Sequence, residues 1–334
     1  MIHTLICDLL KIRHPIVLGG MAGGHTSVEL AAAVSNAGGL GTLGLGRRPA
    51  GNVAGDIRSL RSATRHSFGV NFLLFTACDE AIDAALKERP PVFATAWARA
   101  DQDLQMCFAH AHDAGCVVMH QVSTVAEARR AKAAGADIIV AQGTEGGGHV
   151  GWMASMTLLP MVVDAAGATP VLAAGGIADG RGLVAALALG AQGVLLGTRF
   201  LATKESLLHP KFKQALLDSD GHDTVLTEIP DLARGSVWPG AMSRVQRNAF
   251  IERWAGREWE LRACQPEALA SLQKATAEGD ATNASLFMGQ DAGLICDIPA
   301  AAELVERMVK EAEDLMKDRL PKIVSASPNP SSLR

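Results

Sequence analysis

The feature that most constrains this chain is an alternation of short apolar runs with helical segments, repeated eight times between residue 15 and about residue 200. Each apolar run is continuous rather than alternating, which is typical of strands in a parallel sheet covered on both faces. The eight runs span residues 15–20, 40–45, 68–74, 91–97, 116–122, 137–143, 170–176 and 193–198. Eight strand–helix units at about 25-residue spacing predict an α/β fold, the (β/α)8 or TIM barrel.

Helical segments lie between these runs, and three of them end in a similar glycine-containing turn. They span residues 28–37, 53–63, 80–87, 102–114, 125–134, 155–166 and 182–189. Three of them are followed by similar turns, in which Gly38, Gly135 or Gly190 stands where a helix C-cap requires a left-handed residue. We expect these three glycines to be structural and to lie at the lower end of the barrel.

The pattern changes after Phe200, where polar and charged helical stretches replace the strand–helix units. Residues 206–283 predict an added C-terminal helical domain that forms a lid or part of the substrate site. Residues 284–322 predict a return segment with an amphipathic helix that packs on the barrel. The barrel itself is expected to span residues 1–205, and the Ser-, Pro- and Asn-rich residues 323–334 are expected to be a disordered tail.

Composition excludes several classes of protein. Hydrophobic residues make up 48% of the chain, enough for a core, and the net charge of −4 provides no basic surface for nucleic acid. The six cysteines lie far apart without metal-ligand spacing, so we expect free thiols and no bound metal. The N-terminus lacks a signal-peptide pattern and no apolar stretch reaches membrane-spanning length, which predicts a cytoplasmic protein without a membrane partner.

Glycines follow several of the predicted strands, at the end of a barrel where functional groups lie. Gly175 and Gly176 end the seventh run, and Gly197 and Thr198 end the eighth. Loops at these two positions commonly hold a phosphate through backbone N–H groups. The sequence therefore predicts a phosphate site there, for either a sugar phosphate or a flavin.

A second glycine-rich stretch, residues 39–44, has the GxGxxG spacing of a dinucleotide-binding motif. It follows a helix and runs into a strand, which is the reverse of the order that the motif requires. We therefore interpret these glycines as structural.

His149 is the strongest candidate for a catalytic side chain. Three consecutive glycines precede it and predict a loop at the C-terminal end of the sixth strand. An imidazole there can take a proton from a carbon acid or hold an anion. We expect structural positions for His25 and His120, whose roles stay open, and a helix-capping role for Asp179, while Glu145 is a candidate carboxylate base.

Six short motifs occur along the chain in a fixed order: residues 15–21 (PIVLGGM), 37–41 (AGGLG), 69–71 (GVN), 145–151 (EGGGHVG), 173–180 (AAGGIADG) and 196–200 (LGTRF). These motifs resemble the FMN-dependent nitronate monooxygenase family, formerly called 2-nitropropane dioxygenases, and the related flavin-dependent enoyl-acyl-carrier-protein reductases. The resemblance covers about residues 8–210 and reappears near residues 288–297. It implies a barrel with a helical second domain. It also implies an enzyme that oxidises alkyl nitronates with O2 to a carbonyl compound and nitrite.

The resemblance also implies FMN as the cofactor and a set of residues around it. The backbone near Gly175, Gly176, Gly197 and Thr198 would hold the phosphate, and Gly20 would lie against the isoalloxazine ring. The remaining residues implied around FMN are Met21, also against the ring, and Asn71, Gln121, Gln142, Gly147, Gly148 and Ala174. The family histidine that matches His149 is the catalytic base.

The substrate and the electron donor are left open at this point. Residues 93–97 lack the aromatic stretch of some nitronate oxidisers, and Gln121 and Gln142 stand where other members carry a lysine or an acid. An NAD(P)H-dependent reductase of enoyl thioesters or quinones would share the same motifs. A non-catalytic flavin-binding barrel would also keep the fold. Whether NAD(P)H is used and whether the chain forms a homodimer stay open too.

Overall fold

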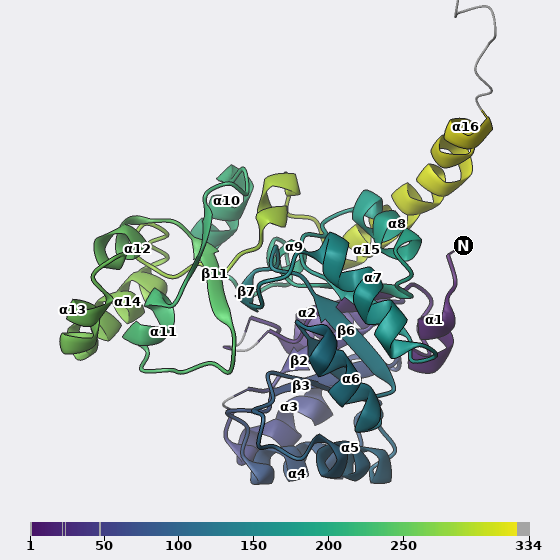
Figure 1. The fold of residues 1–334 in the computed structure, drawn as a ribbon, viewed down its shortest axis with the longest axis horizontal. Helices are drawn as coiled ribbons and strands as arrows, with labels where there is room; N and C mark the ends of the chain where they lie inside the picture. Colours follow the sequence, from purple (N-terminus) through teal and green to yellow (C-terminus); the bar gives the residue numbers. More distant parts are fainter. Residues whose placement is uncertain (1, 22, 24, 47, 326–334) are drawn as a thin grey trace, which may run out of the picture.

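The computed structural model describes residues 2–21, 23, 25–46 and 48–325, and within them eight parallel strands form a barrel (Figure 1). The strands are β1 (Ile16–Leu18), β2 (Gly41–Gly44), β3 (Phe68–Leu73), β4 (Val92–Ala96), β5 (Val117–Val122), β6 (Ile138–Gln142), β8 (Val171–Ala174) and β9 (Gly193–Leu196). Their order is β1-β9-β8-β6-β5-β4-β3-β2, and an isolated bridge between Val17 and Leu40 joins the two ends. Each strand lies inside one predicted run, so the predicted (β/α)8 fold is confirmed.

Helices alternate with these strands and cover the outside of the barrel. They are α2 (Val28–Asn36), α3 (Ala50–Ala63), α4 (Asp79–Lys87), α5 (Leu104–Asp113), α6 (Val125–Ala133), α7 (Ser155–Ala166) and α8 (Gly180–Ala188). Gly38, Gly135 and Gly190 have φ of 93°, 94° and 95°, as the C-cap turns predict. Asp179 caps α8 by accepting the backbone N–H of Arg181 at 2.9 Å, which confirms its predicted role.

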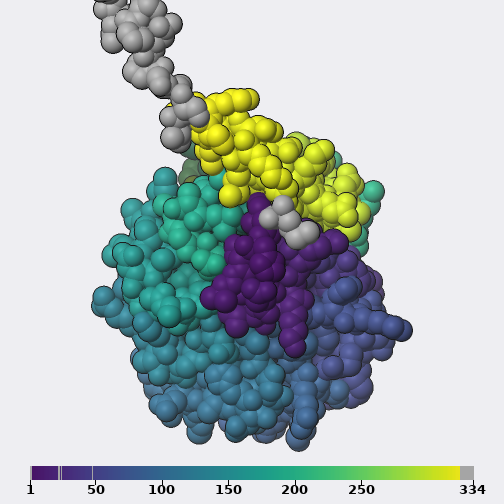
Figure 2. Space-filling view, turned by 90° about the vertical axis from the view of Figure 1, so that its right-hand side faces the viewer, coloured from purple at the N-terminus to yellow at the C-terminus, as the bar shows by residue number. Residues whose placement is uncertain are grey.

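The lower end of the barrel is filled by the N-terminal helix α1 (Leu5–Leu10). Ile6, Cys7 and Leu10 are buried there against inward-facing residues of the strands, such as Ile138 and Leu172. Figure 2 shows this end of the molecule, with the N-terminal segment in purple at its centre. The filled end leaves ligand binding to the opposite end, where the loops follow the strands.

The glycines of residues 39–44 serve the packing of α2 on the barrel. A Cβ atom at Gly41 would collide with the backbone of Ala31, so we expect Gly41→Ala to lower the free energy of unfolding by about 3 kcal/mol. Gly55→Ala in α3 is the matched control, because no atom lies within 4 Å of its Cβ position. The control should be neutral or stabilising by up to about 1 kcal/mol. Denaturant unfolding of both variants checks this, and equal stabilities would contradict it.

The chain beyond the barrel forms a second unit, which we call the lobe (residues 206–294), on the left of Figure 1. Its helices are α10 (Pro210–Asp218), α11 (Ile229–Ala233), α12 (Ala249–Trp254), α13 (Glu258–Ala263), α14 (Gln265–Glu278) and the 3-10 helix η1 (Gln290–Leu294), and the short α9 (Thr198–Leu201) precedes them. Besides the predicted helices, the lobe contains two strands that the sequence analysis did not predict, β10 (Thr224–Thr227) and β11 (Met242–Gln246). They form an antiparallel sheet with β7 (Gly148–Val150), which leaves the barrel between β6 and α7.

The C-terminal segment returns to the barrel. Helix α15 (Ala301–Asp314) packs against α8 and α2 and buries Leu304, Val305 and Met308. It continues through a π-helical turn, η2 (Leu315–Arg319), into α16 (Leu320–Ser325), which extends away from the barrel (Figure 1). Residues 323–325 of the predicted tail belong to α16, and residues 326–334 lie outside the described residues. Among the described helices, none has the length and apolar character needed to cross a membrane.

Candidate active site

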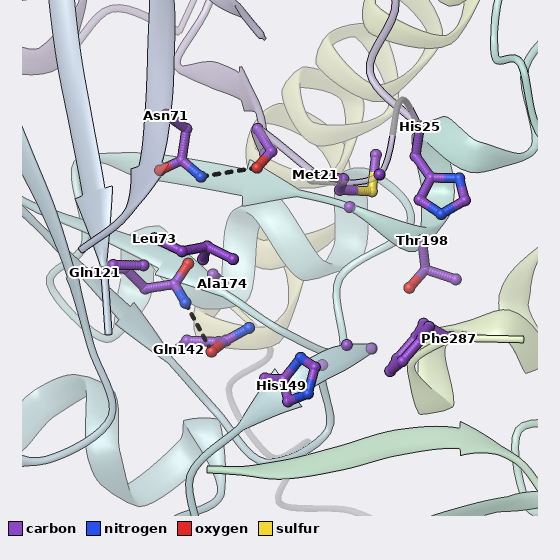
Figure 3. A pocket seen from close by; sticks show the side chains of 18 of the residues that line it. Met21, His25, Asn71, Leu73, Gln121, Gln142, His149, Ala174, Thr198 and Phe287 are labelled. Atoms are coloured by element: carbon purple, nitrogen blue, oxygen red, sulfur yellow. Dashed lines mark hydrogen bonds between the residues drawn. The ribbon is translucent and has the colours of Figure 1, made fainter. Parts of the chain in front are cut away.

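A cavity of about 620 Å³ opens at the end of the barrel where the strands end (Figure 3). Its size lies within the range of small-molecule and cofactor sites. Every residue that the sequence analysis assigns to catalysis or to FMN lines it: Gly20, Met21, Asn71, Gln121, Gln142, Gly147, Gly148, His149, Ala174, Gly175, Gly176, Gly197 and Thr198. The barrel therefore brings together residues from four of its strands and from the segments that follow β1, β6, β8 and β9.

Two hydrogen bonds orient the amide side chains on the cavity floor. The Asn71 amide donates to the backbone carbonyl of Gly20 at 2.8 Å, and the Gln121 amide donates to Gln142 Oε1 at 2.9 Å (Figure 3). Because the amide oxygen of Gln142 accepts this bond, its NH2 group is directed elsewhere and can donate to a ligand. A Cβ atom at Gly20 would collide with Asn71, so this position requires glycine.

Glycine backbone forms another wall of the cavity. Gly175 and Gly176 have φ of 92° and 75°, in the left-handed region that favours glycine. The only atom within 4 Å of a Cβ position at Gly197, among the described residues, is the sulfur of Met21 at 3.6 Å. These glycines line the cavity with main chain, and this suits the binding of a phosphate through backbone N–H groups.

His149 lies in a strand, and its predicted position on a loop is wrong. Gly146 and Gly147 lead the chain away from β6, and β7 then pairs with β11, in which Ser243 stands directly opposite His149. The pairing partner is 94 residues further along the chain, so the sequence around His149 carries no sign of it. The strand fixes the backbone of His149 more firmly than a glycine-rich loop would.

The imidazole of His149 is held by two polar side chains. Its Nε2 lies 2.9 Å from Asp231 Oδ1 and 3.1 Å from Ser243 Oγ, and the Ser243 hydroxyl donates to Asp231 Oδ2 at 2.6 Å. Both carboxylate oxygens of Asp231 act as acceptors, so Nε2 carries a proton and donates it to the carboxylate. In the neutral imidazole the lone pair is then on Nδ1. The His149 and Asp231 side chains are 12% and 10% exposed, which shields the pair from water.

Aromatic side chains gather around this histidine, although the chain contains few of them. The Trp238 ring stacks on His149 with centroids 3.3 Å apart, and the Phe287 ring lies at 5.5 Å. Phe75 and Trp97 pack in turn on Trp238, at 4.5 and 6.1 Å. Trp97 has φ of 57°, a conformation that is costly for a bulky residue and that clusters at functional sites. The catalytic candidate thus faces an apolar, aromatic region.

Two arginines and a histidine also line the cavity: Arg48, Arg234 and His25. Arg48 is paired with Asp56, and the Arg234 guanidinium donates to Ser285 Oγ at 2.9 Å. Burial, together with the charge of Arg234, holds the pKa of His25 below its ordinary value, which favours the neutral ring. The positive charge of the arginines suits an anionic group of a ligand.

Two other candidates from the sequence have structural positions. The Glu145 carboxylate accepts the backbone N–H and the hydroxyl of Ser155, each at 3.0 Å, so it anchors the start of α7 and does not act as a free base. His120 is buried, and its Nδ1 lies 2.7 Å from Thr95 Oγ1. Burial lowers the pKa of His120 to about 4, which keeps the ring neutral.

The sequence analysis missed the residues that the lobe contributes. Asp231, Arg234, Ser236 and Trp238 line the cavity, and Ser243 contacts His149. Asp231 is 82 residues from His149 and belongs to a short helix that no periodic pattern marks. The pairing of β7 with β11 brings these residues to the barrel, and no local motif predicts that pairing.

A (β/α)8 barrel with a glycine-walled cavity at its mouth and a carboxylate-bound histidine beside it defines an enzyme that works with a bound cofactor. The family model for nitronate monooxygenase matches residues 3–98 and 78–311 of the chain. The chain is therefore a member of the nitronate monooxygenase family, an oxidoreductase whose cofactor is FMN.

Three relatives illustrate the range of this similarity. A (3aS,4S,5R,7aS)-5-hydroxy-7a-methyl-1-oxo-octahydro-1H-indene-4-carboxyl-CoA dehydrogenase of Mycobacterium tuberculosis is 33% identical, over 93% of this chain and 96% of its own. FabK from Thermotoga maritima has a TM-score of 0.85 and 36% identity, over 95% of this chain and 98% of its own. A nitroalkane oxidase from Streptomyces ansochromogenes has a TM-score of 0.79 and 31% identity, over 93% and 98%.

Proposed function

We propose that this protein oxidises alkyl nitronates with O2 to a carbonyl compound and nitrite, with His149 as its catalytic base. The observation that carries the proposal is the His149 imidazole, which Asp231 and Ser243 hold at the cavity. A histidine in this setting suits chemistry that begins with the removal of a proton from a carbon acid. Bound FMN supplies the electron-transfer chemistry and the reaction with O2.

The cavity residues fit FMN in the following arrangement. We assign the phosphate to the backbone at Gly175, Gly176, Gly197 and Thr198, all of which line the cavity. The isoalloxazine ring is assigned to Gly20 and its neighbours. The other residues assigned to the cofactor are Met21, Asn71, Gln121, Gln142, Gly147, Gly148 and Ala174. The NH2 group of Gln142, which Gln121 orients, would be available to hold FMN through a hydrogen bond.

His149 acts in this proposal through Nδ1. Asp231 holds the proton on Nε2, so the lone pair of Nδ1 accepts the proton from the carbon next to a neutral nitro group. The imidazolium that results attracts the nitronate anion, and Asp231 compensates its positive charge. Trp238 and Phe287 cover the ring and exclude water from the reaction.

The barrel and the residues that follow it have different roles in this proposal. We propose that the barrel, residues 1–205, holds FMN, and that residues 206–283 cover the substrate side of the cavity. Asp231 and Trp238 reach the cavity from this covering part. The base is on the barrel segment between β6 and α7, and its partners come from the cover.

A second candidate function is the NAD(P)H-dependent reduction of an enoyl thioester or a quinone. Similarity to a carboxyl-CoA dehydrogenase and to FabK supports it. So do the arginines of the cavity lining, since Arg48 and Arg234 suit the phosphates of a nicotinamide nucleotide or of coenzyme A. Nicotinamide would be placed over the flavin, which explains why no Rossmann motif is needed.

Two measurements on the FMN-loaded enzyme separate the candidates. Oxygen uptake with propyl-2-nitronate should be fast and should release nitrite if the protein is a nitronate oxidiser. Anaerobic mixing with NADH or NADPH should then bleach the flavin absorbance slowly or not at all. Rapid bleaching without oxygen uptake from the nitronate would instead establish the reductase.

A further inference from the structure

A buried carboxyl group lies at the end of the cavity to which the FMN phosphate is assigned. Asp291, in η1, lines the cavity and is 5% exposed. Two bonds fix η1 at this place: the Gly289 N–H donates to Thr198 Oγ1 at 3.0 Å, and the Gln290 N–H donates to the Glu145 carbonyl at 2.9 Å. The Asp291 carboxyl lies against the same glycine, since a Cβ atom at Gly289 would collide with Asp291 Oδ1. Asp291 and the phosphate would therefore share Thr198 as a neighbour.

The charged groups around Asp291 are engaged elsewhere. On α9, Arg199 donates to the side chain of Asp297 at 2.8 Å and to its carbonyl at 3.2 Å. In the loop before β7, the Glu145 carboxylate accepts the hydrogen bonds that anchor α7. On α10, the Lys213 ammonium donates to two backbone carbonyls. Burial raises the pKa of Asp291 to about 7, against the opposing effect of Arg199.

An ionised carboxylate at this place would oppose the cofactor. A phosphate monoester carries close to two negative charges above its second pKa, which is about 6. Two anions in a buried site repel each other strongly, whereas a neutral carboxylic acid offers a hydrogen-bond donor to a phosphate oxygen. Protonation thus converts Asp291 from a repelling group into a binding group.

We propose that Asp291 recognises the cofactor phosphate as a neutral carboxylic acid, so that FMN binding is coupled to the uptake of one proton. This inference rests on the proposed placement of the phosphate at Gly175, Gly176, Gly197 and Thr198. The proton taken up from solution stays covalently bound to the Asp291 carboxyl, whose O–H group would form a hydrogen bond to a phosphate oxygen. When the pH rises above the pKa of the free site, binding must first take a proton from solution, and the affinity falls.

The test compares FMN with riboflavin, which lacks the phosphate. Dissociation constants are measured by quenching of flavin fluorescence between about pH 7 and pH 9, where the phosphate stays dianionic. For the wild-type protein, the constant for FMN should rise by up to about tenfold per pH unit. The constant for riboflavin should stay nearly level, because riboflavin brings no second anion to Asp291.

Two substitutions sharpen the test. Asp291→Asn keeps the shape of the side chain and donates through its NH2 group at every pH, so the constant for FMN should become independent of pH. Asp220→Asn is the matched control, because Asp220 is exposed and its backbone lies behind η1. This control should keep the wild-type dependence on pH.

The outcomes separate the role of Asp291 from the proposed placement of the phosphate. A wild-type constant for FMN that does not change with pH, or one that changes equally for riboflavin, would overturn the role of Asp291. Equal affinities for FMN and riboflavin at every pH would overturn the phosphate placement itself. The wild-type comparison decides both points even if Asp291→Asn does not fold, and neither measurement depends on turnover.

Discussion

Replacing His149 by Asn should lower kcat by about 10²–10⁴-fold while FMN stays bound, because the base is removed but the cofactor site is left intact. His149 contacts Asp231, Ser243 and Trp238, whereas the residues assigned to the phosphate are elsewhere in the cavity. Asn fills part of the imidazole volume and can still donate to Asp231, so the local structure should survive.

The measurement is steady-state turnover of the FMN-loaded variant, together with its flavin absorbance spectrum. His110→Asn is the control, because His110 is a half-exposed histidine on α5 whose Nδ1 lies 3.7 Å from Asp83 Oδ1, outside the cavity lining. It should leave turnover unchanged. Full activity in His149→Asn would remove this residue from the mechanism, and loss of FMN from the variant would show that its role is in cofactor binding.

Replacing Asp231 by Asn should lower kcat by about 10²-fold with little change in the affinity for FMN. The carboxylate accepts from His149 Nε2 and from the Ser243 hydroxyl at the same time. An amide has a single oxygen, so one of these donors would lose its acceptor and the imidazole would lose its fixed tautomer. We therefore regard Asp231 as a positioning residue that acts through His149.

A double-mutant cycle separates this role from a general structural one. In the His149→Asn background, Asp231→Asn should cause almost no further loss of kcat, because its effect needs the imidazole. Ser243→Ala, which removes one acceptor and one donor, should cost less than Asp231→Asn. If the losses in the cycle simply multiplied, Asp231 would act independently of His149.

Periodicity predicts the barrel well because each strand–helix unit carries its own apolar pattern. The turns at Gly38, Gly135 and Gly190 follow from local backbone chemistry, and the cavity follows from where barrel loops lie. The reversed GxGxxG stretch is a packing feature, as the order of its elements predicts, since Gly41 contacts the backbone of α2.

The sequence is much less informative about the lobe and the partners of His149. Strands β7, β10 and β11 are three to five residues long, and β7 pairs with a strand more than 90 residues further along the chain. Such short segments have no periodicity of their own, so residues 206–283 predict only helices. The roles of Asp231 and Ser243 become visible only in the structure, where the strand register sets Ser243 opposite His149.

The three-stranded sheet places the catalytic candidate on a boundary within the molecule. By sequence, β7 belongs to the barrel, but by hydrogen bonding it belongs to the lobe. An insertion or exchange in the lobe can therefore change the surroundings of His149 while the residues that are assigned to the flavin on barrel strands, such as Asn71 and Gln121, keep theirs. This separation gives the fold a route by which relatives with one cofactor site diverge toward different substrates.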